Sequence, residues 1–520
     1  MDQLYVYIVG FLLLLAIIDL IVGVSNDAVN FLNSAIGSRV SSRRNIMIIA
    51  SMGILVGVSL STGMMEVARK GIFNPQLFTF SDVMVIFLAV MLTDIFLLDL
   101  FNTHGLPTST TVSIVFELLG TSVIVALLKT NFQVIQLEQY INTTSALVII
   151  SGIFLSVGIA FVAGSIVQFI SRVIFSYDYR EKPNYKAIIW SSMALTILLF
   201  FILIKGASNN IFMTEAMKSW INSNVGSIII ACAFSSFLIT AILWVLKIDL
   251  FKIIVLVGTF SLALSFASND LVNFVGVPLA GFQSFKAWGL ANAAADSYTM
   301  SILNQPIRTD GYLLIIAGVI MIITLWLSKK ARSVTETEVN LASHDTDNER
   351  FKPNRFSSGL VKLGLKSYNV LKEITPKKVG VTISNQLDPK RRVYQKNPPA
   401  FDTVRAAVNL TTASILISLA TSLKLPLSTT YVSFMVAMGT ALADRAWGRK
   451  SAANRISGVL VVLGGWFFTA FIAFIASSIF ALMIYLWGIM GMGVVLVVVS
   501  GSLIYNHRVF RKKNDKRISV

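Results

Sequence analysis

The sequence predicts an all-α polytopic membrane protein with about 11–13 membrane segments, built as an inverted repeat. Apolar residues make up 55% of the chain and charged residues only 13%, and the mean hydropathy is +0.74. A water-exposed globular surface could not accommodate this composition. Two short polar motifs each occur twice in the same order, and basic residues gather between the apolar segments. These three observations carry the prediction.

The apolar segments have roughly the length that crosses a bilayer. They fall near 4–24, 46–65, 83–101, 106–128, 146–170, 187–205, 226–247, 251–268, 312–328, 402–423, 426–443, 456–483 and 484–505. The first has no basic residues before it and no small-residue cleavage site after it, so we expect a retained span rather than a signal peptide. The segments at 106–128 and 426–443 open with hydroxyl residues, which predicts re-entrant or broken helices.

The repeated motifs define two halves. Ser-Asn-Asp-Ala-Val-Asn-Phe at 25–31 returns as Ser-Asn-Asp-Leu-Val-Asn-Phe at 268–274. Pro-Thr-Ser-Thr-Thr at 107–111 returns as Pro-Leu-Ser-Thr-Thr at 426–430, and a glycine follows each proline by thirteen residues. The two motifs are 80 residues apart in the first copy and 156 in the second, or 84 once the 72-residue polar segment 329–400 is removed. The sequence therefore predicts a duplicated unit with a soluble loop inserted in its second copy.

The distribution of Lys and Arg predicts the orientation, because basic residues mark the cytoplasmic ends of spans. Counting each segment as one crossing puts all four basic clusters in the cytoplasm and the N-terminus outside. The same count gives the two copies opposite topology, the inverted repeat of secondary transporters. The net charge of +17 then reflects topology rather than nucleic-acid binding. The clusters are Arg39, Arg43 and Arg44; Arg172, Arg180, Lys182 and Lys186; Arg445, Arg449, Lys450 and Arg455; and Arg508, Arg511, Lys512, Lys513, Lys516 and Arg517.

The chain divides at the edges of these features. The expected parts are 1–128, the first half with both motifs; 129–250, connecting helices; 251–328, the start of the second half; 329–400, a basic cytoplasmic insertion; 401–505, the rest of the second half and the C-terminal helices; and 506–520, a basic cytoplasmic tail. The insertion carries fifteen Lys or Arg against seven Asp or Glu. Its stretch 360–366 is interpreted as a solvated linker or as a short amphipathic helix on anionic lipid.

The Asn-Asp motifs predict a cation site. A carboxylate in a membrane span costs about 2.5–3.5 kcal/mol on insertion scales, so Asp27 and Asp270 should face a cavity and hold a partner. The Ser-Asn-Asp run is a poor helix former and favours local unwinding. Unwound carbonyls, amide oxygens and carboxylates suit a small hard cation such as sodium. The alternative is a polar clamp that only packs helices. The expected ligands of the coupling ion are Asn26, Asp27, Asn30, Asn269, Asp270 and Asn273, with the two aspartates holding sodium.

The Pro-x-Ser-Thr-Thr motifs predict an anion site. Proline favours the first turn of a helix, and the following residues offer free backbone N–H groups beside their hydroxyls. Two such helix starts could bind one tetrahedral oxyanion, but Asp27 and Asp270 would repel it. A cation between carboxylate and anion, or protons on the aspartates, would remove the repulsion, which predicts cotransport. The expected anion ligands are Ser109, Thr110, Thr111, Ser428, Thr429 and Thr430.

The paired motifs resemble those of the inorganic phosphate transporter family, the cation-coupled phosphate symporters also called phosphate permeases. The resemblance covers nearly the whole chain outside 329–400. It implies that the six hydroxyl residues cradle phosphate and that the Asn-Asp residues hold sodium or a proton. The chain departs from the family pattern at Ser25 and Ser268, where Gly or Ala is usual, and at Val112 and Tyr431, where histidine is usual.

The expected function is therefore import of inorganic phosphate with sodium ions or protons. The alternatives are a carrier of sulfate or another oxyanion and an anion channel or sensor. We expect no enzyme activity, no cofactor beyond the coupling ion, and an integral protein of the plasma (inner) membrane, with a homodimer left open. Further intramembrane candidates for a proton path or ion pairs are Asp19, Asp94, Asp99, Glu117, His104 and Lys424.

Overall fold

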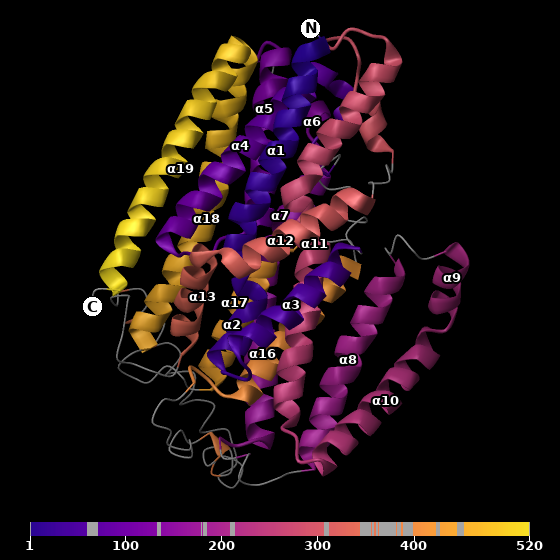
Figure 1. The fold of residues 1–520 in the computed structure, drawn as a ribbon, viewed down its shortest axis with the longest axis vertical. Helices are drawn as coiled ribbons and strands as arrows, with labels where there is room; N and C mark the ends of the chain where they lie inside the picture. Colours follow the sequence, from indigo (N-terminus) through magenta and orange to yellow (C-terminus); the bar gives the residue numbers. More distant parts are fainter. Residues whose placement is uncertain are drawn as a thin grey trace.

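The fold is that of a computed structural model, which Figure 1 shows with its longest axis vertical. The structure describes residues 2–59, 71–132, 137–177, 179, 185–208, 214–305, 311–343, 399–422, 427–444 and 452–518, with isolated positions inside 344–398. Helix α19 begins near the end of the molecule that holds the N-terminus and runs away from it, while α8 and α10 lie along the opposite edge (Figure 1).

The described chain is helical throughout, with two isolated β-bridges, Phe73 with Ile141 and Thr79 with Thr299. The elements are α1 Asp2–Asp27, α2 Val29–Gly37, α3 Arg43–Val58, η3 Pro75–Leu77, α4 Phe80–His104, α5 Thr110–Lys129, α6 Leu137–Tyr140, α7 Thr143–Ile174, α8 Lys186–Ser208, α9 Glu215–Ser223, α10 Val225–Val245, α11 Leu250–Ala291, η5 Ser301–Asn304, α12 Gly311–Leu327, α13 Lys329–Ala342, α16 Thr403–Ser422, α17 Thr429–Ala443, α18 Ala452–Trp487 and α19 Ile489–Ile518.

The predicted fold class, an all-α polytopic membrane protein, is confirmed. Ten helices in the described part of the chain are long and apolar enough to cross a membrane, or eleven if α12 and α13 form one span bent by 69°. Two of the expected segments give shorter helices, because α3 has 16 residues and α17 has 15. A straight crossing needs about 20.

The predicted unwinding at the Asn-Asp motifs is wrong. Helix α11 is continuous through its whole copy of the motif, and the first copy has a one-residue break at Ala28, which keeps helical dihedral angles. The Ala28 amide still donates to the Val24 carbonyl at 3.0 Å. The polar side chains find partners on other helices, so the backbone has no need to leave its own hydrogen bonds. Both Asn-Asp pairs therefore lie within helical backbone.

Two glycines let the motif helices pack closely. Helix α5 lies against α18 and α17 lies against α7. A Cβ on Gly120 would lie 2.4 Å from the carbonyl oxygen of Phe474, and one on Gly439 would lie 2.2 Å from that of Phe161. Small residues allow this approach of backbones inside a membrane. These are the glycines that follow each proline by thirteen residues, so their spacing serves helix packing.

The start of the predicted insertion is part of the folded body. Residues 329–342 form α13, which packs against α2, α1, α4 and α17. Its buried residues recur every three or four positions, as Ala331, Val334, Glu338 and Leu341 do, which is the pattern of a helix with one covered face. The expected soluble loop therefore cannot begin before residue 343. The stretch 360–366 lies largely outside the described residues.

A buried arginine joins three segments on the side of the bundle where α7 and α17 end. Arg172 is fully buried and forms ion pairs of 2.8 Å with Asp444, also fully buried, and with Asp402. Gln168 adds a hydrogen bond of 2.7 Å to Asp444. Removing one member of a buried ion pair leaves an uncompensated buried charge, which typically lowers the free energy of unfolding by about 3–5 kcal/mol.

We therefore expect Arg172→Ala to destabilise the protein by about 3–5 kcal/mol. Thermal unfolding of the purified protein in detergent should show a clearly lowered midpoint. Arg44→Ala is the matched control, because Arg44 is exposed and its loss should change stability by no more than about 0.5 kcal/mol. Equal midpoints for the two variants would contradict this role of Arg172.

Candidate substrate and ion site

The four motifs meet at one buried site between α1, α2, α5, α11 and α17. Every side chain expected to bind ion or anion is at most 4% exposed. The residues come from both halves of the chain, so the site exists only when the halves are packed together. The members are Asn26, Asp27, Asn30, Asn269, Asp270, Asn273, Ser109, Thr110, Thr111, Ser428, Thr429 and Thr430.

The second asparagine of each Asn-Asp motif donates hydrogen bonds to threonines in the other half of the chain. The Asn30 amide donates to the hydroxyls of Thr429 and Thr430 at 3.2 and 3.0 Å. The Asn273 amide donates in the same way to Thr110 and Thr111 at 3.2 and 3.0 Å. The two halves therefore make equivalent cross-contacts with equal distances. The inverted orientation of the halves stays a prediction.

Each aspartate accepts hydrogen bonds from both helix starts. The Thr110 hydroxyl donates to Asp27 at 2.9 Å and Thr430 donates to it at 3.3 Å. Asp270 accepts a short bond from Thr429 and one of 3.4 Å from Thr111. The two carboxylates lie close enough for their charges to act on each other. Four threonine hydroxyls thus surround two like charges in a region without exposure to solvent.

The serines of the second motif cap their helices. Ser109 precedes α5 and its hydroxyl accepts a bond of 3.1 Å from the Val112 amide. Ser428 precedes α17 and accepts one of 3.1 Å from Tyr431. A serine cap satisfies one of the free amides at a helix start, and the remaining amides and the positive end of the helix dipole still favour an anion there. The threonines at the first two positions of each helix therefore carry the hydroxyls that face the aspartates.

The asparagines before each aspartate have different surroundings. The Asn26 amide donates to Asn102 at 2.8 Å and to the Leu106 carbonyl at 3.2 Å, and its oxygen accepts from the Thr108 amide at 2.9 Å. The side-chain nitrogen and oxygen of Asn26 thus both hold the connection between α4 and α5. Asn269 donates to Leu427 at 3.1 Å and to Asp270 at 3.0 Å, but its oxygen is buried without a hydrogen-bond partner. That oxygen is available to a cation.

Tyr431 directly follows the second Pro-x-Ser-Thr-Thr motif. Its ring stacks on Trp466 with centroids 3.8 Å apart, and the Trp466 indole donates to the Pro107 carbonyl at 3.2 Å. The tyrosine of one half therefore supports the helix start of the other through Trp466. Its hydroxyl is buried without a hydrogen-bond partner.

The sequence analysis did not identify several residues that contribute hydrogen bonds or ring contacts to this site. Ser433 donates to the Asn30 oxygen at 3.2 Å, and Asn102 holds Asn26. Ser433 follows Thr430 by three residues, so helical periodicity places it on the same face and could have indicated it. Nothing in the sequence pairs Asn102 or Trp466 with the motifs, because both contacts join distant segments.

Other predicted charged candidates lie away from this site. Asp99 forms an ion pair of 2.5 Å with Lys330 of α13. His104 is exposed at the end of α4. Lys424 and Pro426 lie outside the described residues.

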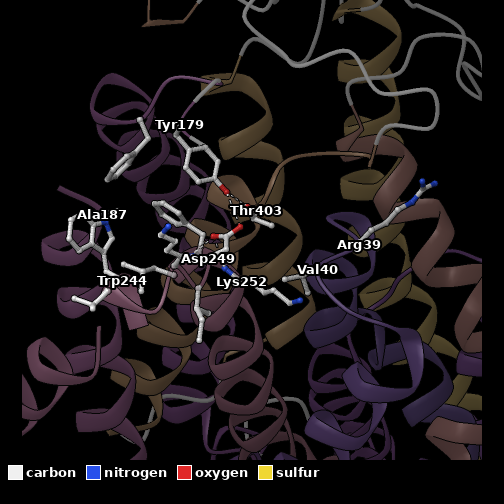
Figure 2. Close-up of a pocket in the computed structure, with 14 residues that line it drawn as sticks. Arg39, Val40, Tyr179, Ala187, Trp244, Asp249, Lys252 and Thr403 are labelled. Carbon is white, nitrogen blue, oxygen red and sulfur yellow. Dashed lines mark hydrogen bonds between the residues drawn. The ribbon is translucent and has the colours of Figure 1, made fainter. Parts of the chain in front are cut away.

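A separate cavity of about 970 Å³ lies at the start of α11. Figure 2 shows Tyr179, Thr403 and Asp249 converging on one side of it, with Lys252 and Arg39 further along. Its lining contains none of the motif residues, and the rest of it is largely apolar, with Phe175, Trp244 and Phe251. This cavity is therefore not the site that the motifs form.

The fold and the buried two-sided site define a polytopic membrane transporter. The sequence matches the phosphate transporter family over residues 23–336, more than half of the chain, and the chain belongs to this family. The matched range includes both Asn-Asp motifs and the first Pro-x-Ser-Thr-Thr motif. A solved structure described as "The sodium-dependent phosphate transporter" has the same fold, with a TM-score of 0.59 and 14% identity over 95% of this chain and 99% of that one. No curated protein matches the sequence.

The surroundings of Asn26 predict a structural role. Asn26→Ala removes the partner of the buried Thr108 amide and the donor to the Asn102 side-chain oxygen, so we expect a loss of about 1–3 kcal/mol in stability. Thermal unfolding in detergent measures it. Asn45→Ala, at an exposed position, is the control and should stay within about 0.5 kcal/mol of the wild type. An unchanged unfolding midpoint for Asn26→Ala would show that the Asn26 amide does not stabilise the connection between α4 and α5.

Proposed function

We propose that the protein is a secondary active transporter that imports inorganic phosphate by symport with sodium ions or protons. The observation that carries the proposal is the crossed set of hydrogen bonds, in which threonines at two helix starts meet Asp27 and Asp270. Membership of the phosphate transporter family supports phosphate as the substrate.

The site offers donors in the arrangement that a tetrahedral oxyanion needs. Four threonine hydroxyls, the amides of Asn30 and Asn273 and two helix N-termini converge from both halves. Helix starts and oriented hydroxyls bind phosphate through charge-assisted hydrogen bonds. The equal contributions of the two halves would let the anion be released to either side when one half moves against the other.

The carboxylates make anion binding depend on a cation. In this arrangement the threonine hydroxyls donate to Asp27 and Asp270, so they are not free for phosphate. A cation or proton on the aspartates would remove the repulsion and release the hydroxyls to the anion. Binding of cation and anion would then each favour the other, which is the condition for coupled transport.

The ligands of the coupling ion would be side-chain oxygens. Because α11 is continuous through its motif, the backbone carbonyls of residues 268–273 stay within the helix, and the Phe274 carbonyl lacks its i+4 donor because Pro278 has no N–H. The oxygens available near the aspartates are their own carboxylates, the threonine hydroxyls and the free oxygen of Asn269. Hard oxygen ligands of this kind suit sodium, and the carboxylates also accept protons.

Uptake into proteoliposomes tests the proposal. The purified protein is reconstituted, and labelled phosphate uptake is measured with an imposed sodium gradient, an imposed proton gradient or neither, with excess unlabelled sulfate as competitor. We expect uptake against the phosphate gradient only with one of the cation gradients, and no inhibition by sulfate. Inhibition by sulfate would favour an oxyanion carrier of different selectivity. Uptake that runs only down the phosphate gradient would indicate a channel, and both results would contradict the proposal.

The threonine hydroxyls predict the effect of single variants. Thr110→Val and Thr429→Val keep the shape of the side chain but remove a donor, so each should raise the phosphate KM by roughly tenfold to a hundredfold, since a hydrogen bond to a charged group contributes about 1.5–3 kcal/mol. Thr108→Val is the matched control, because its hydroxyl lies 3.2 Å from Thr469 instead of an aspartate. A KM unchanged in both site variants would exclude these hydroxyls from phosphate binding.

A further inference from the structure

Three carboxyl groups that the proposed site does not use lie together inside the bundle. Asp19 belongs to α1, Asp94 to α4 and Glu117 to α5, and α4 packs against both α1 and α5. Each of the three side chains has 0% exposure. We call these residues the acidic triad.

The acidic triad has few hydrogen-bond donors. Ser113 donates to one oxygen of Glu117 at 2.8 Å. Both oxygens of Asp19, both oxygens of Asp94 and the second oxygen of Glu117 are buried without a hydrogen-bond partner. Buried polar atoms are nearly always hydrogen-bonded, and protons shared between neighbouring carboxyl groups would satisfy these five oxygens.

The acidic triad lies close to the phosphate site along α1. The charge of Asp19 interacts with those of Asp94, Glu117 and Asp27. Asp19 precedes Asp27 by eight residues, which places it about two turns earlier on α1, about 80° around the helix and about 12 Å away along the helix axis. Asp94 interacts with Asp19 and with Ser113, and Glu117 interacts with Asp94 and Ser113.

Among the described residues, the charges that act on the acidic triad belong to other carboxyl groups and not to Lys or Arg. Lys129 of α5 is paired with Asp82 at 2.6 Å, and Lys330 of α13 is paired with Asp99 at 2.5 Å. Among the titratable groups on the packed helices, Asp27 is the one that acts on Asp19, and it is also an acid. The groups are Tyr5, Tyr7 and Asp27 on α1; Asp82, Asp99 and His104 on α4; Lys129 on α5; Glu138 and Tyr140 on α6; Lys252, Asp270 and Lys286 on α11; Tyr312 on α12; Lys329, Lys330, Arg332, Glu336 and Glu338 on α13; Tyr485 on α18; and Tyr505, His507, Arg508, Arg511 and Lys512 on α19.

Protons fit this arrangement better than a metal ion. In the part of the chain that the structure describes, no three His, Cys, Asp or Glu side chains have the spacing of a metal site. Three ionised carboxylates so close together in a region of low dielectric would repel one another strongly. A protonated carboxyl becomes a donor and can bond to its neighbour, which satisfies oxygens that otherwise have no partner.

We propose that Asp19, Asp94 and Glu117 form an intramembrane proton-binding site, distinct from the Asp27–Asp270 site. Its protonation sets the charge next to Asp27. An ionised Asp19 favours a cation at Asp27 and opposes the phosphate, while a protonated one does neither. The link to transport rests on the proposed function, and it makes phosphate uptake depend on pH through the acidic triad.

Infrared difference spectroscopy tests proton binding without any transport. The purified wild type is compared at acidic and alkaline pH for the carbonyl stretch of protonated carboxyl groups, together with Asp19→Asn, Asp94→Asn and Glu117→Gln. We expect a protonated-carboxyl band in the wild type, and a partial loss of it in each variant. Asp99→Asn is the matched control on α4, because Asp99 is ion-paired with Lys330, and it should keep the band. Sodium at constant pH should leave unchanged the part of the band that the three variants lose, because sodium is proposed to act at Asp27 and Asp270.

Uptake measurements then connect the site to transport. Sodium-driven phosphate uptake is measured over a pH series, and the three amide variants, which imitate the protonated acids, should lose the pH dependence of the wild type. Wild-type protein without the band, variants that keep both the band and the wild-type pH profile, or sodium that removes the part of the band lost in the variants would each overturn the proposal. A band that the variants lose in a protein that carries no phosphate would support the proton site and refute the proposed function.

Discussion

The main physical constraint on this structure is the repulsion between two carboxylates that lie together inside a membrane. Asp27 and Asp270 come from different halves of the chain, are fully buried and lie close enough for their charges to interact. Such a pair is costly in a medium of low dielectric. The threonine hydroxyls and the two helix starts reduce the cost through hydrogen bonds and dipoles, but they contribute no full positive charge. In the proposed mechanism, this uncompensated negative charge would give a cation its affinity for the site.

The rest of the fold holds these groups in place. Gly120 and Gly439 bring α5 and α17 into contact with α18 and α7, so that both helix starts reach the centre. Asn26 fixes the connection before α5, and Trp466 joins Pro107 to the ring of Tyr431. The site is therefore assembled by contacts between segments far apart in the sequence. Movement of either half would alter donors and carboxylates at the same time, as coupled transport requires.

The sequence predicted the site more completely than it predicted its surroundings. Composition and span length were enough for the fold class, and duplication was enough to single out the residues that meet. The cross-contacts of Asn30 and Asn273 with the threonines of the other half were not predicted. The unwinding of the motifs was predicted wrongly, because intrinsic helix propensity is weak against the interhelical partners that the side chains find. The packing of α13 and the role of Asn102 could not be predicted, since both depend on contacts between distant segments. The acidic triad was visible only as separate charges in apolar segments.

The central claim is that phosphate binds only when a cation neutralises Asp27 and Asp270. Equilibrium binding of labelled phosphate to the purified protein, titrated with sodium against choline at several pH values, tests it most directly. The account predicts that phosphate affinity rises with sodium or with acidity, and that phosphate raises the affinity for the same cation by the same factor. Phosphate that binds equally tightly in choline at alkaline pH would contradict it.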